Sequence, residues 1–257
     1  MKLWNFKREQ NTISEALQVS LPEHAVISVV GAGGKTSLIF AWAQELASEG
    51  KTVVISTTTH MMHPEFAKSA YPAKALIYYS DYSPSKSELA EDFAQIDSLL
   101  ESERILMLAS VDPSNNHKVT SPPQELLDYT CAVADVVLIE ADGSRRMPLK
   151  WPKAHEPVVP KNTAISICVA GLSALGRPLQ DALYNAEGLP QAMSRDTIDE
   201  ALIAAIVSSP DGGLKGTHED YRVFLNQADT EELQEKATHI QALLAVRGIQ
   251  SAWGTLY

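Results

Sequence analysis

Short apolar runs alternate with longer amphipathic segments along most of the 257-residue chain. The short runs are rich in branched residues and are bounded by polar or turn residues, a pattern typical of buried strands. The longer segments carry apolar residues at helical spacing. The pattern predicts strands at residues 25–30, 52–56, 75–79, 104–109, 135–140, 165–170, 221–225 and 249–253. It predicts helices at residues 12–19, 38–49, 84–100, 123–129, 197–208 and 230–246.

Local signals refine some of these boundaries. Thr12 and Glu15 have the spacing of a capping box, so a short helix is expected to begin there. Pro84 is expected at the first helical position of its helix, where the missing N–H costs nothing. Residues 110–118 are expected to form a loop.

Strands that alternate with helices predict an α/β fold with three layers: a mostly parallel sheet with helices on both faces. Ligands of such sheets bind outside the carboxyl ends of the strands. The chain has no internal repeat or low-complexity linker, so one domain is expected over residues 1–257, with a long functional loop at about residues 143–162.

Composition excludes several classes of protein. Apolar residues make up 45% of the chain and charged residues 21%, as in ordinary globular proteins. A net charge of −11 argues against a general nucleic-acid binder, which needs a basic excess. No apolar run approaches membrane-spanning length. Cys131 and Cys168 lie in or beside apolar runs and form no metal-binding pair, so we expect reduced, buried thiols in a cytoplasmic protein.

The strongest chemical signal is Val-Val-Gly-Ala-Gly-Gly-Lys-Thr-Ser at residues 29–37. A strand, a glycine-rich turn and a helix N-terminus can close backbone N–H groups around a phosphate. Lys35 would reach the terminal phosphates, and Thr36 would hold Mg²⁺. The first glycine of the usual spacing is replaced by Val29, and the alternative is a plain strand-to-helix turn with an exposed lysine. The predicted nucleotide-binding residues of this loop are Gly31, Ala32, Gly33, Gly34, Lys35, Thr36 and Ser37.

A second signal is the apolar run at residues 136–139, which ends in Glu140 and is followed by Asp142. An acid after a buried strand is what a nucleotide-hydrolysing site needs to hold Mg²⁺ or to position a water. Glu140 and Asp142 are two residues apart, so both would face the nucleotide if the strand continues. The alternative is an ordinary strand that ends in a turn.

Asn226, Gln227 and Asp229 follow a late strand and resemble the base-reading motif of guanine-binding proteins, in which a lysine stands where Gln227 stands here. An aspartate at this place accepts hydrogen bonds from guanine that adenine cannot donate. Asn226 and Asp229 are therefore predicted to read the base. The alternative is a helix cap made by Asp229 with Glu232.

Residues 56–63 bring hydroxyls and two histidines to the end of another predicted strand. Thr59 and His60 are candidates for a contact with the γ-phosphate or the substrate, as in switch segments. His60 and His63 are three residues apart and would share a helical face, which leaves a two-histidine metal site as an alternative. Threonine runs are also common in ordinary strands.

The predicted long loop concentrates basic residues in an otherwise acidic chain. Arginine side chains suit phosphate and carboxylate ligands. The alternative is a solvated loop stiffened by proline. A glycine-rich stretch at residues 210–216 is either a second anion-binding loop or a flexible connector. The candidate substrate-binding residues of the long loop are Arg145, Arg146, Lys150, His155 and Glu156.

Together these segments resemble the YqeC-type family, accessory proteins linked to selenium-dependent molybdenum hydroxylases. The resemblance implies a P-loop-type nucleotide-binding fold and a place in selenium or molybdenum cofactor maturation, with maturation proteins as partners. It implies a pathway and not a mechanism. Its motifs span most of the chain: Val-Val-Gly-Ala-Gly-Gly-Lys-Thr (29–36), Thr-Thr-Thr-His-Met (57–61), Glu-Ala-Asp-Gly-Ser-Arg-Arg-Met-Pro-Leu-Lys (140–150), His-Glu-Pro-Val-Val-Pro (155–160), Gly-Gly-Leu-Lys-Gly (212–216) and Leu-Asn-Gln-Ala-Asp (225–229).

The leading hypothesis is a Mg²⁺-dependent nucleotide-binding enzyme, an NTPase that favours GTP over ATP. The second hypothesis is a small-molecule kinase or nucleotidyltransferase, which has the same fold and binds its acceptor at the long loop. The third hypothesis is a non-catalytic assembly factor that senses nucleotide. In the leading hypothesis the residues with catalytic roles are Lys35, Glu140, Asp142, Thr59 and His60, and the Mg²⁺ ligands are Thr36, Glu140 and Asp142.

Overall fold

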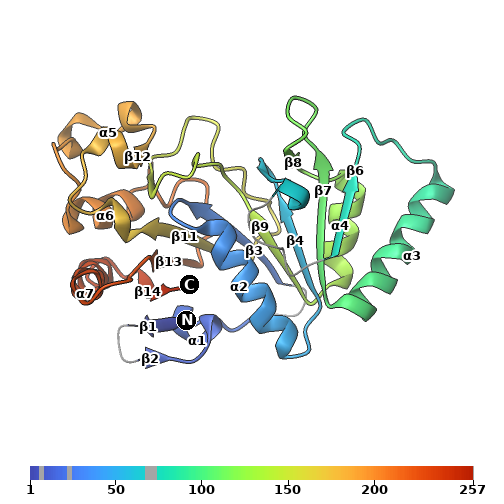
Figure 1. The fold of residues 1–257 in the computed structure, drawn as a ribbon, viewed down its shortest axis with the longest axis horizontal. Helices are drawn as coiled ribbons and strands as arrows, with labels where there is room; N and C mark the ends of the chain where they lie inside the picture. Colours follow the sequence, from blue (N-terminus) through green and yellow to red (C-terminus); the bar gives the residue numbers. More distant parts are fainter. Residues whose placement is uncertain (6–8, 22–24, 67–73, 257) are drawn as a thin grey trace.

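A computed structural model describes residues 1–5, 9–21, 25–66 and 74–256 of the chain. Its centre is a run of parallel strands within one large sheet (Figure 1). In spatial order these strands are β14 (Gln250–Thr255), β13 (Tyr221–Asn226), β11 (Ile165–Gly171), β3 (Ala25–Gly31), β9 (Val136–Glu140), β4 (Val53–Thr57), β7 (Ile105–Val111) and β6 (Lys74–Tyr78).

Short antiparallel strands extend both edges of the sheet. β1 (Lys2–Asn5) pairs with β14, and β2 (Glu9–Gln10) pairs with β1. At the other edge β8 (Lys118–Thr120) pairs with β7, and β5 (Met61–Met62) pairs with β8. The prediction of a loop at residues 110–118 was therefore wrong at both ends, because β7 runs on to Val111 and β8 begins at Lys118. A separate parallel pair joins β10 (Leu149–Lys150) to β12 (Leu183–Tyr184).

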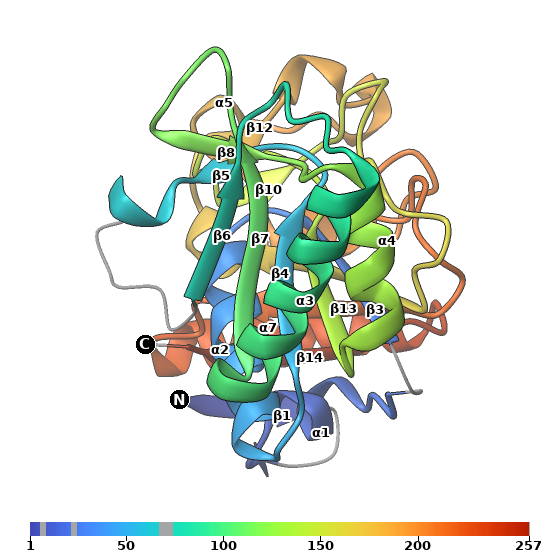
Figure 2. The same ribbon diagram turned by 90° about the vertical axis from the view of Figure 1, so that its right-hand side faces the viewer.

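Helices cover both faces of the sheet, so the prediction of a three-layer α/β fold with a mostly parallel sheet is confirmed. Figure 2 shows α2 and α3 on opposite sides of β4 and β7. Short turns of helix, including α5 (Leu179–Ala182), join β11 to α6. One face carries α1 (Ile13–Leu17) and α2 (Lys35–Ser48), and the other carries α3 (Lys86–Glu103), α4 (Gln124–Val133), α6 (Glu200–Val207) and α7 (Glu231–Ala245).

The core follows the two-residue period of the strands. In β9, Val136 and Leu138 pack in the cluster that contains α2, whereas Val137 and Ile139 pack in the cluster that contains α3 and α4. Strands buried on both faces read as continuous apolar runs, which is why the sequence revealed them. In the part of the chain that the structure describes, no helix is both long and apolar enough to cross a bilayer.

Helix starts agree with the capping signals in part. The Thr12 side chain accepts from the Glu15 N–H, as predicted, and caps α1. The prediction for Pro84 was wrong, because α3 begins at Lys86 after a Ser85 cap. The Ser85 hydroxyl and the Glu88 carboxylate form a complete capping box, which satisfies more backbone donors than a proline at the first position.

The strand order explains where a site can form. After β3 the chain moves out through β4 and β6 to β7, returns to β9 beside β3, and then crosses β3 to β11. Strand order therefore changes direction on either side of β3. In open α/β sheets such a switch point leaves a crevice at the carboxyl ends of the strands. The ends of β3, β4, β9, β11 and β13 all lie at this edge because these strands are parallel.

Candidate functional site

The turn from β3 to α2, residues 31–34, depends on its glycines; we call it the glycine loop. Gly31, Gly33 and Gly34 have φ values of 90°, 84° and 117°, in the left-handed region. A Cβ on Gly33 would lie 2.3 Å from the Gly171 nitrogen, and a Cβ on Gly34 would lie 2.2 Å from Asn226 Nδ2. Close backbone approach and strained φ both require glycine here.

N–H groups of the glycine loop form hydrogen bonds to neighbouring segments, whereas those of the first turn of α2 lack intrahelical partners. The first-turn N–H groups of α2 at residues 34–37 have no intrahelical partner, and Gly34 supplies no side-chain cap. These N–H groups and the partial positive charge of the helix terminus create a place for an anion. The bonds that anchor the loop run from Gly31 N to Asp142 Oδ2 (3.0 Å), from Ala32 N to Val169 O (2.9 Å) and from Gly33 N to Met147 O (3.1 Å).

Lys35 is buried and not exposed, so the alternative of a turn with an exposed lysine is wrong. Its Nζ donates to Gly31 O at 2.7 Å and lies 3.1 Å from Asp142 Oδ1 and 3.8 Å from Glu140 Oε1. Burial alone would lower the pKa of Lys35, but Asp142 and Glu140 raise it above its ordinary value. The ammonium is therefore charged and held at the start of α2.

Glu140, the last residue of β9, contacts the first turn of α2. Thr36 Oγ1 donates to Glu140 Oε2 at 2.7 Å. Burial raises the pKa of Glu140, and Lys35 and the Thr36 hydroxyl oppose that rise. A hydroxyl, a carboxylate and an ammonium thus meet within one buried cluster at the carboxyl ends of β3 and β9.

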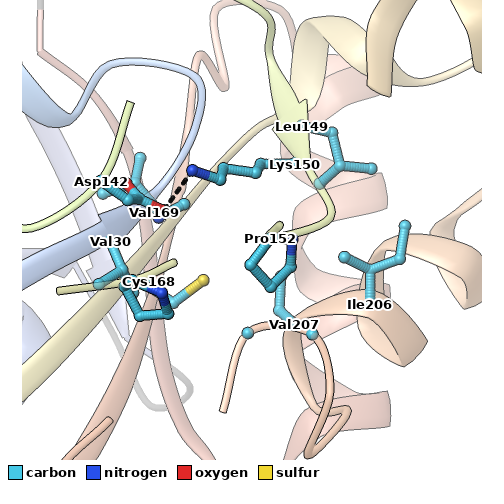
Figure 3. Close-up of a pocket in the computed structure, with 13 residues that line it drawn as sticks. Val30, Asp142, Leu149, Lys150, Pro152, Cys168, Val169, Ile206 and Val207 are labelled. Atoms are coloured by element: carbon cyan, nitrogen blue, oxygen red, sulfur yellow. Dashed lines mark hydrogen bonds and ion pairs between the residues drawn. The ribbon is translucent and has the colours of Figure 1, made fainter. Parts of the chain in front are cut away.

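Asp142 joins this cluster to a second lysine. Lys150 Nζ lies 3.0 Å from Asp142 Oδ2 (Figure 3). It also lies 2.9 Å from Glu156 Oε2 and donates to Gly143 O. Burial would raise the pKa of Glu156, but Lys150 lowers it below its ordinary value overall. Lys35, Glu140, Asp142, Lys150 and Glu156 form one continuous network of buried charges, which we call the charge cluster.

Residues 57–60, after β4, lie beside Glu140. Thr57 Oγ1 donates to Glu140 O at 2.9 Å, and the Thr58 N–H donates to the same oxygen at 3.2 Å. Thr59 N donates to Thr57 Oγ1, whereas the buried Thr59 Oγ1 has no hydrogen-bond partner among the described residues. An orphaned buried hydroxyl at the sheet edge is available to an external ligand.

His60 is more than half exposed and pairs with Asp112, whose Oδ2 lies 3.3 Å from His60 Nε2. The expectation that His60 and His63 share a helical face was wrong, because strand β5 separates them. Within the described ranges no cluster of three metal-ligating His, Cys, Asp or Glu side chains occurs. The two-histidine metal alternative therefore loses the shared helical face on which it was based.

Asn226 and Asp229 occupy different environments at the end of β13. Asn226 is buried, and its Nδ2 donates to Gly33 O at 2.8 Å, so it braces the glycine loop. Asp229 is exposed and accepts from Thr255 Oγ1 at 2.7 Å. The helix-cap alternative for Asp229 is wrong, since Thr230 caps α7 by accepting from Leu233 N.

The predicted substrate-binding residues of the long loop divide into two groups. Lys150 and Glu156 are buried in the charge cluster, whereas Arg145, Arg146 and His155 are exposed. Arg145 and Arg146 have φ values of 49° and 63°, a conformation that non-glycine residues rarely adopt. Consecutive strained residues are typical of functional loops.

Behind the Asp142–Lys150 pair lies a small cavity of about 20 Å³, enough for about one water molecule. Cys168 Sγ points into it toward Pro152 (Figure 3). Burial raises the pKa of Cys168 to about 12, so the thiol is protonated at neutral pH. Cys168 is buried as predicted, whereas Cys131 is half-buried.

The sequence analysis assigned no individual role to three residues that contact the site: Ser144, Thr57 and Tyr184. Ser144 Oγ lies 3.5 Å from Lys35 Nζ, and its place directly after Asp142-Gly143 was the available signal. Thr57 belongs to the hydroxyl run that the sequence did single out. Tyr184 gave no signal, because its contact with the long loop arises only from the pairing of β10 with β12.

Comparison with known proteins agrees with this arrangement. The family model described as YqeC protein matches residues 27–187. The chain belongs to the YqeC family. A YqeC relative from Escherichia coli (strain K12), described as an uncharacterized protein, is 32% identical over 236 residues, which cover 89% of this chain and 86% of the relative. The resemblance seen in the sequence is confirmed, and the stretch matched by the YqeC model contains the whole charge cluster.

Proposed function

We propose that the protein binds a Mg²⁺–nucleoside triphosphate at the glycine loop and acts on its terminal phosphate. The observation that carries this proposal is the meeting of Lys35, Thr36 and Glu140 in one buried cluster at the start of α2. Lysine, hydroxyl and carboxylate are the groups that nucleotide-hydrolysing sites place around the β- and γ-phosphates and their metal.

The geometry fits a phosphate. The N–H groups at residues 34–37 lack intrahelical partners, and the helix terminus favours negative charge. Lys35 lies in the charged state within the same turn. In the absence of ligand its ammonium is neutralised by Asp142 and Glu140, so a phosphate would compete with these carboxylates for it.

Oxygen ligands suited to Mg²⁺ lie in the same cluster. The Thr36 hydroxyl and the Glu140 carboxylate are already in contact, and hard oxygen ligands are what this ion prefers. Apart from its charge contact with Lys35, Asp142 Oδ1 has no hydrogen-bond partner among the described residues. Thr36, Glu140 and Asp142 would hold the ion, which would supply charge neutralisation for the phosphates.

Thr59 and His60 are proposed to contact the reacting end of the nucleotide. The Thr59 hydroxyl is buried, unpartnered among the described residues and next to the end of β9. It can donate to a phosphate oxygen or to the attacking water. His60 is exposed at the same edge, where its ring can reach a ligand only from the solvent side.

Base selection is proposed to rest on Asp229, with Asn226 bracing the loop. The Asp229 carboxylate is exposed three residues after the end of β13, whereas Asn226, the last residue of β13, donates to Gly33 O in the glycine loop. A carboxylate accepts from the N1–H and amino groups of guanine, which supports GTP over ATP. Gln227, in place of lysine, bonds Ser173 instead.

Phosphoryl or nucleotidyl transfer is a second candidate function. Arg145 and Arg146 project into solvent from a strained loop next to the charge cluster, and neither has a carboxylate within ion-pair distance among the described residues. Such arginines can hold an anionic acceptor. Membership of the YqeC family supports placing either activity in the maturation of selenium-dependent molybdenum hydroxylases or their cofactor.

The reaction is tested by incubating the protein with Mg²⁺ and γ-labelled GTP or ATP and identifying the labelled product. Release of inorganic phosphate indicates an NTPase, whereas transfer of label to an added acceptor indicates a kinase. Lys35→Ala should abolish turnover, and Lys51→Ala, which removes an exposed lysine three residues beyond the C-terminal end of α2, should leave it unchanged. Nucleotide binding without turnover would favour the assembly-factor reading, and absence of binding would refute the proposal.

A further inference from the structure

An open hollow of about 320 Å³ is lined in part by residues 151–154 of the long loop. Pro152 lines both the hollow and the small cavity behind Asp142. The volume lies within the range of small-molecule sites. Besides Trp151 and Pro152, its lining residues are Lys153, Ala154, Asn185, Gly188, Asp211 and Lys215.

The wall of the hollow is built tightly around Trp151. A Cβ on Gly188 would lie 3.2 Å from Trp151 Cδ1, and a Cβ on Gly212 would lie 2.9 Å from Trp151 Cζ3. Asn185 adopts the left-handed conformation with φ 61° and donates to Pro152 O at 3.4 Å. The two glycines leave no room for a side chain at these contacts, so the wall beside Trp151 is closely packed.

Two lysines of the lining have no acidic partner. In the described part of the chain neither Lys153 nor Lys215 has a carboxylate within 4.0 Å. Lys215 Nζ donates to the carbonyls of Lys153 and Ala154, two other residues of the lining. Lys153 Nζ lies 5.4 Å from the centre of the Tyr184 ring.

The Tyr184 ring, which lies outside the lining of the hollow, is also near two other cations. Lys150 Nζ lies 5.2 Å and Arg145 Cζ lies 6.0 Å from the centre of the same ring. Lys150 is neutralised by Asp142 and Glu156, but Arg145 and Lys153 are not neutralised by any described residue. In a chain of net charge −11, two lining lysines without a described acidic partner, Lys153 and Lys215, favour an anionic ligand in the hollow.

Asp211 adds one exposed carboxylate to the lining. It forms no ion pair with either lysine in the described part of the chain. A carboxylate accepts hydrogen bonds, so it matches a hydroxyl or amino group on the ligand. It also disfavours ligands that are negative at every position.

We infer that this hollow is a second binding site, for a small organic phosphate or carboxylate that also carries a hydroxyl or amino group. Lys153 and Lys215 bind the anionic end, and Asp211 accepts from the other end. If the proposed function holds, this ligand is the acceptor of the nucleotide's phosphate, and that role rests on the proposed function. The inference that the ligand binds in the hollow does not depend on the proposed function.

The test titrates the full-length protein without nucleotide, using glycerol 3-phosphate as the phosphate probe and glycerate as the carboxylate probe, and follows binding by calorimetry. Lys153→Ala/Lys215→Ala should weaken the better probe by at least about tenfold. Lys161→Ala, an exposed lysine outside the hollow, should leave binding unchanged, and so should Lys35→Ala. Asp211→Ala should weaken glycerol 3-phosphate more than sulfate, which has no hydroxyl.

The titrations distinguish binding of the probe in the hollow from binding at the glycine loop. If Lys35→Ala abolishes probe binding and the double variant does not, the probe binds the glycine loop and the inference is overturned. Absence of binding for both probes also overturns it. Should the double variant unfold, single Lys153→Gln and Lys215→Gln variants take its place. If the wild-type protein binds a probe but binds no nucleotide, the proposed function is refuted and the inference of a second binding site is upheld.

Discussion

The charge cluster and the hollow share one short segment, residues 150–153, but the lysines at its two ends lie in opposite environments. Lys150 is buried, with Asp142 and Glu156 both within 3.0 Å. Lys153, three residues on, is half-exposed and has no described carboxylate within ion-pair distance. A buried charge is tolerated only with a partner, whereas a partly exposed cation keeps water as a substitute.

The paired charges of the charge cluster stabilise the fold, whereas the lysines of the hollow are the groups that we infer to bind a ligand. In the charge cluster every group already has a counter-charge, so ligand binding must rearrange existing pairs. In the hollow no such pair has to be broken. Variants should therefore affect folding strongly in the cluster and weakly in the hollow.

The largest effect is expected for Asp142→Ala. Asp142 contacts Lys35, Lys150 and the Gly31 N–H, so its removal leaves two buried ammonium groups short of a partner. The free energy of unfolding in urea should fall by about 3–5 kcal/mol. Asp211→Ala, which removes an exposed carboxylate, should stay within about 0.5 kcal/mol. Equal losses in the free energy of unfolding for the two variants would contradict the difference between the charge cluster and the hollow.

Gly34→Ala should come next. Its Cβ would meet Asn226 Nδ2 at 2.2 Å in addition to the strain of φ 117°. Gly50→Ala is the matched control, because Gly50 also has a positive φ, 87°, but nothing within 4 Å of the added Cβ. The control should lose about 1–2 kcal/mol of stability from strain alone. Gly34→Ala should lose more and should also weaken nucleotide binding, which the control leaves unchanged.

Glu156→Gln should give a pH-dependent loss of about 1–3 kcal/mol. Lys150 holds the pKa of Glu156 below its ordinary value of 4.5, so the folded state favours the ionised carboxylate. The stabilisation is fully present above about pH 4.5 and is lost as pH falls further. The difference between wild type and Glu156→Gln in urea unfolding should therefore shrink below that pH. A difference that is constant with pH would contradict the pairing.

The smallest effect on stability is expected for Lys153→Ala/Lys215→Ala. Neither lysine is paired with a described carboxylate, so thermal or urea unfolding should change by about 0.5 kcal/mol or less per site. A loss as large as that of Asp142→Ala would mean that these lysines support the fold rather than a ligand.

The sequence revealed most of the central sheet, because strands such as β9 are apolar on both faces and stand out as runs. It did not reveal β5 and β10, since two residues carry no period. The boundary at Pro84 failed because the side chains of Ser85 and Glu88 offer a better cap than proline.

Within the candidate site, the residues adjacent in sequence to a strand end could be predicted, and their pairing could not. Glu140 and Asp142 follow β9, and Lys35 follows β3, so the parallel sheet brings them to one edge. That Lys150 and Glu156 turn inward to Asp142 depends on how residues 143–156 fold, and no local pattern encodes that path. That Lys153 has no carboxylate within ion-pair distance among the described residues follows only from the folded structure.

Calorimetric titration of the wild-type protein with Mg²⁺–GTP, repeated with Lys35→Ala and with Lys51→Ala, tests the central claim most directly. We expect saturable one-site binding to the wild type and to Lys51→Ala, and a loss of at least about tenfold in affinity for Lys35→Ala. Mg²⁺–ATP should bind more weakly than Mg²⁺–GTP to the wild type. Absence of binding of either nucleotide at millimolar concentration, or equal binding by folded Lys35→Ala, would contradict a nucleotide site at the glycine loop.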